Sequence, residues 1–329
     1  MLHDANETPH PPVAPRLTKA HAPLTQAVLA MNEHGEQEAV SIPAERALTV
    51  YVDKRELVTL MTLGAHPELL VLGYLRNQRL VQSVSDIDSI TVDWDVGAAA
   101  VKTRSGIDQI EERTAKRVVT TGCGQGSVFG DLMADIDTLK LPPATLAQAQ
   151  LYGIVNAIRL QESTYKSAGS VHGCALFCGE EMLVFVEDVG RHNAIDTIAG
   201  WMWMQDAQAA HTEAAGLPGS PDLPSAMGGG DKIFYTTGRL TSEMVIKSAQ
   251  MGVPIVVSSS GITQMGHAVA QQLGLCTIGR ATNRRFLCYS GADRLLLQPG
   301  LAGPRLRSEP ADAHRIGGGP ARRDEQPLN

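Results

Sequence analysis

A cysteine stands in the middle of a glycine-rich polar segment, Thr120-Thr-Gly-Cys-Gly-Gln-Gly-Ser127. Structural cysteines normally sit among apolar neighbours on a helix or strand, whereas Cys123 has glycine on both sides. The glycines leave the segment conformationally free, so a thiol there is able to move. The reactive form of cysteine is the thiolate, which a polar, accessible setting favours. The segment therefore indicates either a reactive thiolate or a tight turn with an incidental thiol.

Three arginines within six residues form a second candidate site: Arg280, Arg284 and Arg285 in Gly279-Arg-Ala-Thr-Asn-Arg-Arg285. Two other small, hydroxylic segments share its character, Thr236-Thr-Gly-Arg239 and Ser258-Ser-Ser-Gly261. Short side chains let a phosphate approach, and guanidinium groups hold it through charge-assisted hydrogen bonds. A phosphate site and a merely solvated loop both fit this pattern. Arg191 and Arg239 either add to the site or pair with carboxylates such as Glu243 and Asp196.

A zinc site is the weaker hypothesis. His172, Cys174 and Cys178, with Cys123, have the right side-chain types for zinc. On a strand, however, positions 174 and 178 lie about 13 Å apart at ~3.3 Å per residue. No Cys-x-x-Cys pair occurs in the chain. We therefore expect no metal site and interpret Cys174, Cys178, Cys276 and Cys288 as small core residues on strands; a polar role for His172 stays open.

The elements that must position these residues are clearest in the last part of the chain. A β-α-β-α-β order is predicted there: strands at Ile233–Tyr235, Ile255–Val257 and Cys276–Ile278, and helices at Thr241–Met251 and Thr263–Leu273. This order implies a parallel sheet with right-handed crossovers. Ligands bind beyond the carboxyl ends of such strands, where all three polar segments fall.

Upstream of this core the pattern mixes strands and helices. Apolar positions at helical spacing predict a helix over 146–162 that packs on the sheet, and another helix runs from about residue 187 through Met202. Alternation and turn signals predict strands at Leu48–Val52, Leu57–Thr62, Ser89–Asp93, Val171–Phe177 and Met182–Val186, with a helix at Glu68–Tyr74.

Composition bounds the function. The 329-residue chain carries a net charge of −7, which argues against nucleic acid as a partner, and 43% hydrophobic content supports two cores. No apolar run is long enough to span a membrane, and five scattered cysteines suit a reducing cytoplasm.

We expect an α/β protein with disordered tails at 1–40 and 299–329. Between them we expect an N-terminal α+β domain at 41–140, with the Cys123 loop at its end, and an α/β domain at 141–298 containing a flexible insertion at 205–231.

Several segments together resemble one known family. They are Glu187-Asp-Val-Gly-Arg-His-Asn-Ala-Ile-Asp196, Thr237-Gly-Arg-Leu-Thr-Ser-Glu-Met244, Val253-Pro-Ile-Val-Val-Ser258 and Leu273-Gly-Leu275 through the arginine segment. The chain resembles the formate dehydrogenase accessory sulfurtransferases, the FdhD/NarQ family, over roughly Glu38 to Ser290. The resemblance implies a cytidine-deaminase-like C-terminal domain without the deaminase zinc site, usually in a homodimer.

The resemblance also implies a function and its residues. Members accept sulfur from a cysteine desulfurase as a cysteine persulfide. They pass it to the molybdenum of bis(molybdopterin guanine dinucleotide), which formate dehydrogenase then takes up. The sulfur-carrying position corresponds to Cys123, and the cofactor-contacting segment corresponds to Arg280, Ala281, Thr282, Asn283, Arg284 and Arg285.

One position departs from the family pattern. The family loop typically has cysteines at both ends of a Cys-x-x-Cys, and this chain has Gly126 at the second position. A single thiol suffices to carry a persulfide, but no second loop thiol is present to help release the sulfur. A cofactor-binding chaperone without transfer chemistry is therefore the alternative function, and a zinc nucleobase deaminase, which needs a metal site, is the least supported one.

Overall fold

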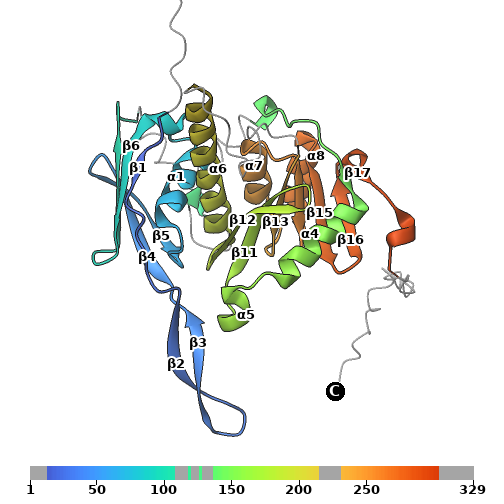
Figure 1. The fold of residues 1–329 in the computed structure, drawn as a ribbon, viewed down its shortest axis with the longest axis horizontal. Coiled ribbons are helices and arrows are strands. Elements are labelled where there is room, and N and C mark those ends of the chain that lie inside the picture. Colours follow the sequence, from blue (N-terminus) through green and yellow to red (C-terminus); the bar gives the residue numbers. More distant parts are fainter. Residues whose placement is uncertain (1–12, 108–117, 120–125, 128–135, 215–230, 304–329) are drawn as a thin grey trace, which may run out of the picture.

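The computed structural model describes residues 13–107, 118–119, 126–127, 136–214 and 231–303 of the chain. Two sheets, each covered by helices, stand on either side of a central helix pair (Figure 1). Cys123, residues 1–12 of the predicted N-terminal tail and residues 304–329 of the predicted C-terminal tail lie outside the described residues, as do residues 215–230 of the predicted insertion.

The first sheet has five strands in the order β1-β6-β7-β4-β5. Their bounds are β1 Arg16–Leu17, β4 Arg46–Val52, β5 Arg55–Thr62, β6 Ile87–Asp93 and β7 Ala98–Thr103. Helix α1, Pro67–Asn77, begins with the expected proline in its first turn and packs on this sheet through its leucines. The three strands and the helix predicted for this region are confirmed, and β1 and β7 add to them.

The second sheet has six strands in the order β12-β11-β13-β14-β15-β16. Their bounds are β11 His172–Cys178, β12 Glu181–Asp188, β13 Lys232–Thr236, β14 Ile255–Ser258, β15 Cys276–Thr282 and β16 Arg285–Ser290. Strands β13, β14 and β15 are parallel, and β11, β12 and β16 pair with their neighbours in antiparallel fashion. The parallel β-α-β-α-β core predicted from the sequence is confirmed.

Alternate strand residues pack on opposite faces of this sheet. On one face, residues such as Leu176, Phe234 and Val256 meet helices α6 (Arg191–Ala214), α7 (Ser242–Gln250) and α8 (Gln264–Leu273). On the other face, Phe177, Ile233 and Val257 meet helix α4, Gln148–Leu160, as the helical spacing predicts. The sheet is therefore buried on both sides, which explains its continuous apolar strands.

Helices α1 and α6 cross with their backbones in contact. A Cβ atom added to Gly73 would lie 1.6 Å from the carbonyl oxygen of Asp196, and one added to Gly200 would lie 2.0 Å from that of Leu69. Glycine is required at both positions because no side chain fits between the helices. The N-terminal part of α6 packs on the second sheet, and Ala207 further along packs in the core of the first. The two cores are thus joined by one helix.

Helix α6 is longer than predicted, so the predicted start of the insertion is wrong. The helix continues to Ala214, whereas the insertion was expected to begin at Gln205. The predicted boundary followed the polar, alanine-rich composition after Met202. A helix tolerates that composition when one face is anchored, and here the buried Ala207 provides the anchor.

The N-terminal tail predicted at 1–40 also needs correction, because residues 16–17, 25–31 and 37–43 form strands. Strands β2, Thr25–Met31, and β3, Gln37–Pro43, pair along their whole length as a hairpin that projects from the body of the protein (Figure 1). Leu29 and Met31 are 70% and 72% exposed. A projecting hairpin has no core to face, so its sequence lacks the apolar periodicity on which the prediction relied.

Short elements complete the described chain. They are α5 Thr164–Ala168, the 3-10 turns Val84–Asp86, Ile136–Thr138, Ala292–Arg294 and Pro299–Leu301, and the two-residue strands β8 Val118–Val119, β9 Gly126–Ser127, β10 Leu146–Ala147 and β17 Leu295–Leu296. Within the described ranges, no helix is long and apolar enough to cross a membrane.

Candidate functional site

Five strands of the second sheet bring polar residues to one edge. The parallel strands β13, β14 and β15 end there at Thr236, Ser258 and Thr282. Because β11 runs antiparallel to β13, it begins at the same edge with His172, which lies directly opposite Asp188 at the end of β12. The sequence segments predicted to lie together at the carboxyl edge are therefore neighbours in space.

The hydroxyl groups at this edge hold the loops in place. The Ser258 hydroxyl donates to the carbonyl of Gly238 at 2.7 Å and accepts from the amide of Ser260 at 2.9 Å. The Thr236 hydroxyl accepts from the Gly238 amide at 3.0 Å. Thr236 and Ser258 are fully buried, so these two hydroxyls serve the fold. The exposed Thr237 and partly exposed Ser259 remain as surface hydroxyls of the two loops.

The arginine segment forms the tip of the β15–β16 hairpin, not a loop that leads into a helix. Strand β15 continues past the predicted end to Thr282, and Arg280 and Asn283 adopt left-handed φ values of 50° and 52° at the irregular pairing there. Arg280, Arg284 and Arg285 all line one cavity of about 790 Å³, the arginine cavity. The structure therefore brings together the three arginines that the sequence singles out.

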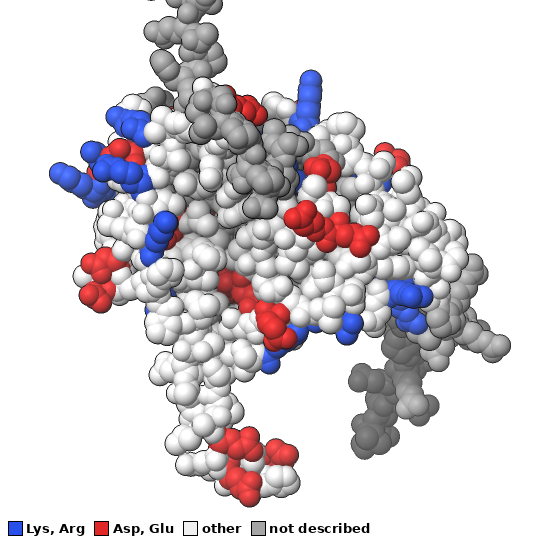
Figure 2. Space-filling model, viewed as in Figure 1, with Lys and Arg blue, Asp and Glu red and all other residues white. Residues whose placement is uncertain are grey.

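Residue by residue, the predicted segment divides in two. Thr282 lines the arginine cavity with the three arginines, and Asn283 lines an adjoining cavity. Ala281 is buried in the core beneath the hairpin. Figure 2 shows basic side chains along the lower right edge of the molecule, at the end of β15 and β16 next to α4.

Sequence reasoning missed one residue of this region, Tyr152 on α4. Its hydroxyl donates to the backbone carbonyl of Arg284 at 3.2 Å and accepts from Gln148 at 2.7 Å. It thereby fixes the hairpin tip against α4. The helical spacing of α4 predicted which residues face the sheet, but gave no signal for a tyrosine that contacts a segment 132 positions later.

His172 lines a separate cavity of about 500 Å³, the His172 cavity, between the start of β11, the end of α4 and α5. Burial lowers the pKa of His172, and the positive charges of Arg191 and Arg239 lower it further. The imidazole is therefore neutral at physiological pH, with one nitrogen that donates and one that accepts. The two nearby arginines give His172 a polar setting, which agrees with the polar role that the sequence left open.

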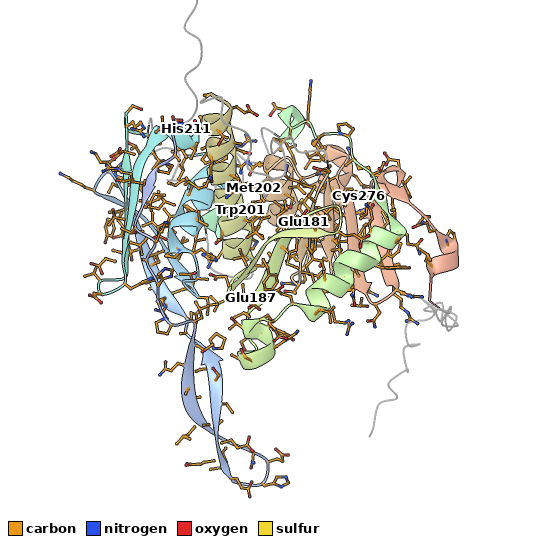
Figure 3. The ribbon with its side chains drawn as sticks, in the orientation of Figure 1. Glu181, Glu187, Trp201, Met202, His211 and Cys276 are labelled. Atoms are coloured by element: carbon orange, nitrogen blue, oxygen red, sulfur yellow. The ribbon has the colours of Figure 1, made fainter. Side chains whose placement is uncertain are left out.

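Glu187 anchors helix α5 over the His172 cavity. Its carboxylate accepts hydrogen bonds from the amides of Thr164 and Tyr165, at 2.5 Å and 3.1 Å, and so occupies the helix N-terminus. Figure 3 shows Glu187 at the end of β12, directed toward α5.

Asp188 links this edge of the second sheet to the first sheet through hydrogen bonds. Its carboxylate accepts hydrogen bonds from the Thr62 hydroxyl, the Leu63 amide, the Gly190 amide and the Asn193 side chain, at 2.5, 3.2, 3.1 and 2.7 Å. Burial raises the pKa of Asp188, and these four hydrogen bonds act in the opposite direction. The start of α6 is thus held between the two sheets.

The two carboxylates considered as partners of Arg191 and Arg239 contact other basic groups. Asp196 pairs with Lys247 at 2.8 Å, and Glu243 lies 3.3 Å from the ring of His192 and 3.6 Å from Lys247. Arg191 is 3% exposed and its side chain passes over Gly238, where a Cβ atom would lie 2.5 Å from it. Lys247 was not considered from sequence because a lysine in a helix normally faces solvent.

The cysteines divide by location. Cys174 and Cys276 are buried on strands as predicted, and Cys178 and Cys288 lie on strands and are half-buried. Cys123 falls outside the described residues. The short strands β8 and β9, which precede and follow it in sequence, pair with each other, and Val119 lies opposite Gly126. Among the described side chains, no three His, Cys, Asp or Glu residues are placed to hold a metal ion.

The sequence model of the FdhD/NarQ family matches residues 43–296 of this chain. The chain belongs to the FdhD/NarQ family. The matched FdhD/NarQ region includes the six-stranded sheet, strands β4 to β7 of the first sheet, α6 and the arginine hairpin, together with the position of Cys123. Family membership therefore covers the whole of the edge described above.

Curated FdhD/NarQ relatives align over most of their length. The sulfur carrier protein FdhD of Halalkalibacterium halodurans is 28% identical over 258 residues, which is 78% of this chain and 88% of the relative. That of Bacillus subtilis is 28% identical over 267 residues, 80% of this chain and 94% of the relative. A crystal structure from Desulfotalea psychrophila, described as a formate dehydrogenase accessory protein, superposes with a TM-score of 0.62 at 22% identity. The superposition covers 83% of this chain and 100% of the solved chain. The fold is therefore shared over the full length of the solved structure.

Proposed function

We propose that this protein is a sulfur carrier for formate dehydrogenase maturation. In this proposal it takes sulfur from a cysteine desulfurase and delivers it to the molybdenum of bis(molybdopterin guanine dinucleotide), its substrate. The observation that carries the proposal is the family match over residues 43–296, with relatives named sulfur carrier proteins. The arginine cavity supports it, because Arg280, Arg284 and Arg285 line it together and guanidinium groups bind phosphates such as those of a nucleotide-bearing cofactor.

The transfer step needs one thiolate, which we assign to Cys123. The thiolate attacks the terminal sulfur of the desulfurase persulfide, a new S–S bond forms on Cys123, and the desulfurase cysteine leaves as a thiolate. The S–S bond on Cys123 then breaks, Cys123 leaves as a thiolate, and the terminal sulfur binds the metal of the substrate as sulfide, with its two electrons supplied by that metal, which is oxidised by two electrons. Gly126 leaves the loop without a second thiol, so release depends on the acceptor rather than on disulfide formation within the loop.

The proposal includes the cellular setting implied by the family. The protein works in the cytoplasm as a homodimer and delivers the cofactor to formate dehydrogenase. The sheet order β12-β11-β13-β14-β15-β16, with three helices on one face and α4 on the other, supports a cytidine-deaminase-like arrangement of the C-terminal domain.

Mass spectrometry tests the chemistry directly. The full chain is incubated with a cysteine desulfurase and cysteine, and the peptide containing Cys123 is expected to gain one sulfur atom. Cys123→Ala should fail to activate formate dehydrogenase in cells. If the peptide gains no sulfur, or the alanine variant activates the dehydrogenase normally, the transfer chemistry is refuted.

The alternative, favoured by Gly126, is a cofactor-binding chaperone without transfer chemistry. It predicts that Arg284→Ala and Arg285→Ala weaken guanine nucleotide binding while Cys123→Ala leaves cellular function intact. The cysteine variant alone therefore separates the two functions. A deaminase would instead require stoichiometric zinc in the purified protein.

A further inference from the structure

A cavity of about 510 Å³, the Arg76 cavity, lies where helices α1, α6 and α7 meet. Arg76 and Arg79 line it from the end of α1, Trp203 from α6 and Gln250 from the last residue of α7. Helix α7 begins at the carboxyl edge of the second sheet and, as a crossover helix, runs back antiparallel to the strands. Its nine residues span about 13 Å, so the cavity lies toward the opposite edge of the sheet from the arginine cavity.

Arg76 is held in a fixed orientation on one wall of this cavity. Its guanidinium lies over the ring of Trp203, 5.1 Å from the ring centroid, and donates to the backbone carbonyl of Ala199 at 2.9 Å. Burial lowers the pKa of Arg76 to about 10, and the carboxylate of Asp206 opposes this shift, so the side chain is charged at neutral pH. A guanidinium with a fixed plane presents its N–H groups at constant angles, which suits the two oxygens of a carboxylate.

Arg79 brings a second guanidinium to the same cavity. With the Gln250 amide in the orientation that satisfies both of its groups, its oxygen accepts from Nε of Arg79 at 3.1 Å. The amide nitrogen of Gln250 donates to the backbone carbonyl of Asn77 at 3.2 Å. The two arginines are therefore positioned by contacts with α6 and α7, not only by their own helix.

The acidic groups around the cavity do not balance the two arginines. The described residues that line it include no carboxylate. Asp86 accepts a hydrogen bond from the backbone amide of Gln82 at 3.0 Å. Asp137 accepts one from Gln272 at 2.6 Å. Asp206 offsets part of the charge of Arg76, and the positive charge that remains attracts an anion.

The cavity also offers apolar surface. Val81 and Leu139 line it together with the arginines. A volume of about 510 Å³ lies within the usual range for small-molecule sites and exceeds what a bare oxyanion fills. An organic acid uses both kinds of wall, because its carboxylate meets the guanidinium groups while its body removes apolar surface from water.

We propose that the Arg76 cavity binds a small organic acid, with its carboxylate on Arg76 and Arg79 and its apolar body against Val81 and Leu139. This site goes beyond the proposed function, because it lies away from the arginine cavity and no step of the sulfur transfer uses it.

Calorimetric titration of the full chain tests the proposal, with benzoate, acetate, benzamide and inorganic phosphate as probes. Benzoate should bind more tightly than acetate, which lacks the apolar body, and more tightly than benzamide, which lacks the charge. Arg79→Gln should weaken benzoate binding about tenfold, because it removes a charged hydrogen-bond donor. Arg16→Gln is the matched control: the side chain of Arg16 is 77% exposed on β1, and its loss should leave benzoate binding unchanged.

Three further variants locate the site. Leu139→Ala should weaken benzoate and leave acetate unchanged, since only benzoate has a body that contacts this wall. Thr138→Trp, at an exposed position that lines the cavity, should obstruct it and weaken both acids. This variant keeps the test valid if Arg76→Gln does not fold. Arg284→Gln should bind benzoate normally, which separates this site from the arginine cavity.

The proposal is overturned if benzoate binds no more tightly than both acetate and benzamide, or if Arg79→Gln and Thr138→Trp both bind it as the unaltered chain does. Phosphate binding without benzoate binding would show that the occupant is not an organic acid, and this result also overturns the proposal. Loss of benzoate binding in Arg284→Gln alone would move the acid to the arginine cavity, with the same consequence.

Discussion

The ammonium group of Lys247 lies 2.8 Å from the carboxylate of Asp196, and both side chains are completely buried. Burial alone would lower the pKa of Lys247, but the carboxylates of Asp196 and Glu243 raise it, so the lysine stays charged. Asn77 on α1 donates to the other oxygen of Asp196 at 2.7 Å. The group therefore links α1, α6 and α7, the helices that join the two sheets.

Removing the lysine leaves Asp196 buried without its counter-charge. We expect Lys247→Met to lower the free energy of unfolding by about 3–5 kcal/mol, measured by denaturant titration. Lys166→Met is the control, because Lys166 lies 3.6 Å from Glu162, whose side chain is 93% exposed, and a surface pair contributes about 0–1 kcal/mol. Equal losses in the two variants would show that the buried pair has no special role.

His192 makes stability depend on pH. Burial lowers its pKa to about 2, and the positive charges of Lys247, Arg191 and His172 act in the same direction, while Glu243 faces the ring at 3.3 Å. Below the ordinary pKa of about 6.5, the unfolded chain takes up a proton that the folded chain does not. The folded state therefore loses stability as pH falls from about 6.5 toward 2, by at most about 1.4 kcal/mol per pH unit.

Denaturant titrations at a series of pH values measure this dependence. His192→Gln should reduce the loss of stability between pH 6.5 and 4, whereas His34→Gln, at an exposed position, should not. A slope that is the same in the unaltered protein and in His192→Gln would show that His192 is not the group responsible.

The contact between α1 and α6 leaves no room for a methyl group. A Cβ atom at Gly73 would come within 1.6 Å of a backbone oxygen of α6, so Gly73→Ala must push the helices apart. We expect a loss of about 3 kcal/mol or more, beyond the usual cost of overpacking, because backbone rather than side chain has to move. Gly300→Ala is the control, since nothing lies within 4 Å of its Cβ position. If the melting temperatures of the two variants agree, the close helix crossing is wrong.

The sequence predicts the local elements well and the long-range links poorly. Apolar runs, the glycine at position 252 and the proline after it were enough to place β13, α7 and β14 within a few residues. The buried contact between Thr62 and Asp188 joins residues 126 positions apart, and no local pattern reports such a pair. The same reason explains the site: the arginines at 280–285 are conspicuous as a cluster, whereas Arg159 joins them only through the packing of α4 against the hairpin.

Cys288 is expected to be the more reactive of the two half-buried thiols. A hydrogen bond from Cys276 lowers the pKa of Cys288, although burial opposes the shift. A hydrogen bond with the Asp231 carboxylate raises the pKa of Cys178 to about 11, and burial adds to it. Cys288 therefore carries the larger thiolate fraction of the two near neutral pH. Iodoacetamide should modify Cys288 faster than Cys178, as followed by peptide mass spectrometry.

This reactivity bears on the sulfur-loading experiment, because a thiolate at Cys288 competes for the desulfurase persulfide. In Cys123→Ser protein, any sulfur still acquired should lie on the Cys288 peptide, and Cys123→Ser with Cys288→Ser should acquire none. Cys123→Ser with Cys178→Ser is the matched control and should retain that residual sulfur. If Cys178 is alkylated as fast as Cys288, the thiolate assignment fails, and residual sulfur at position 288 would then need another explanation than its lowered pKa.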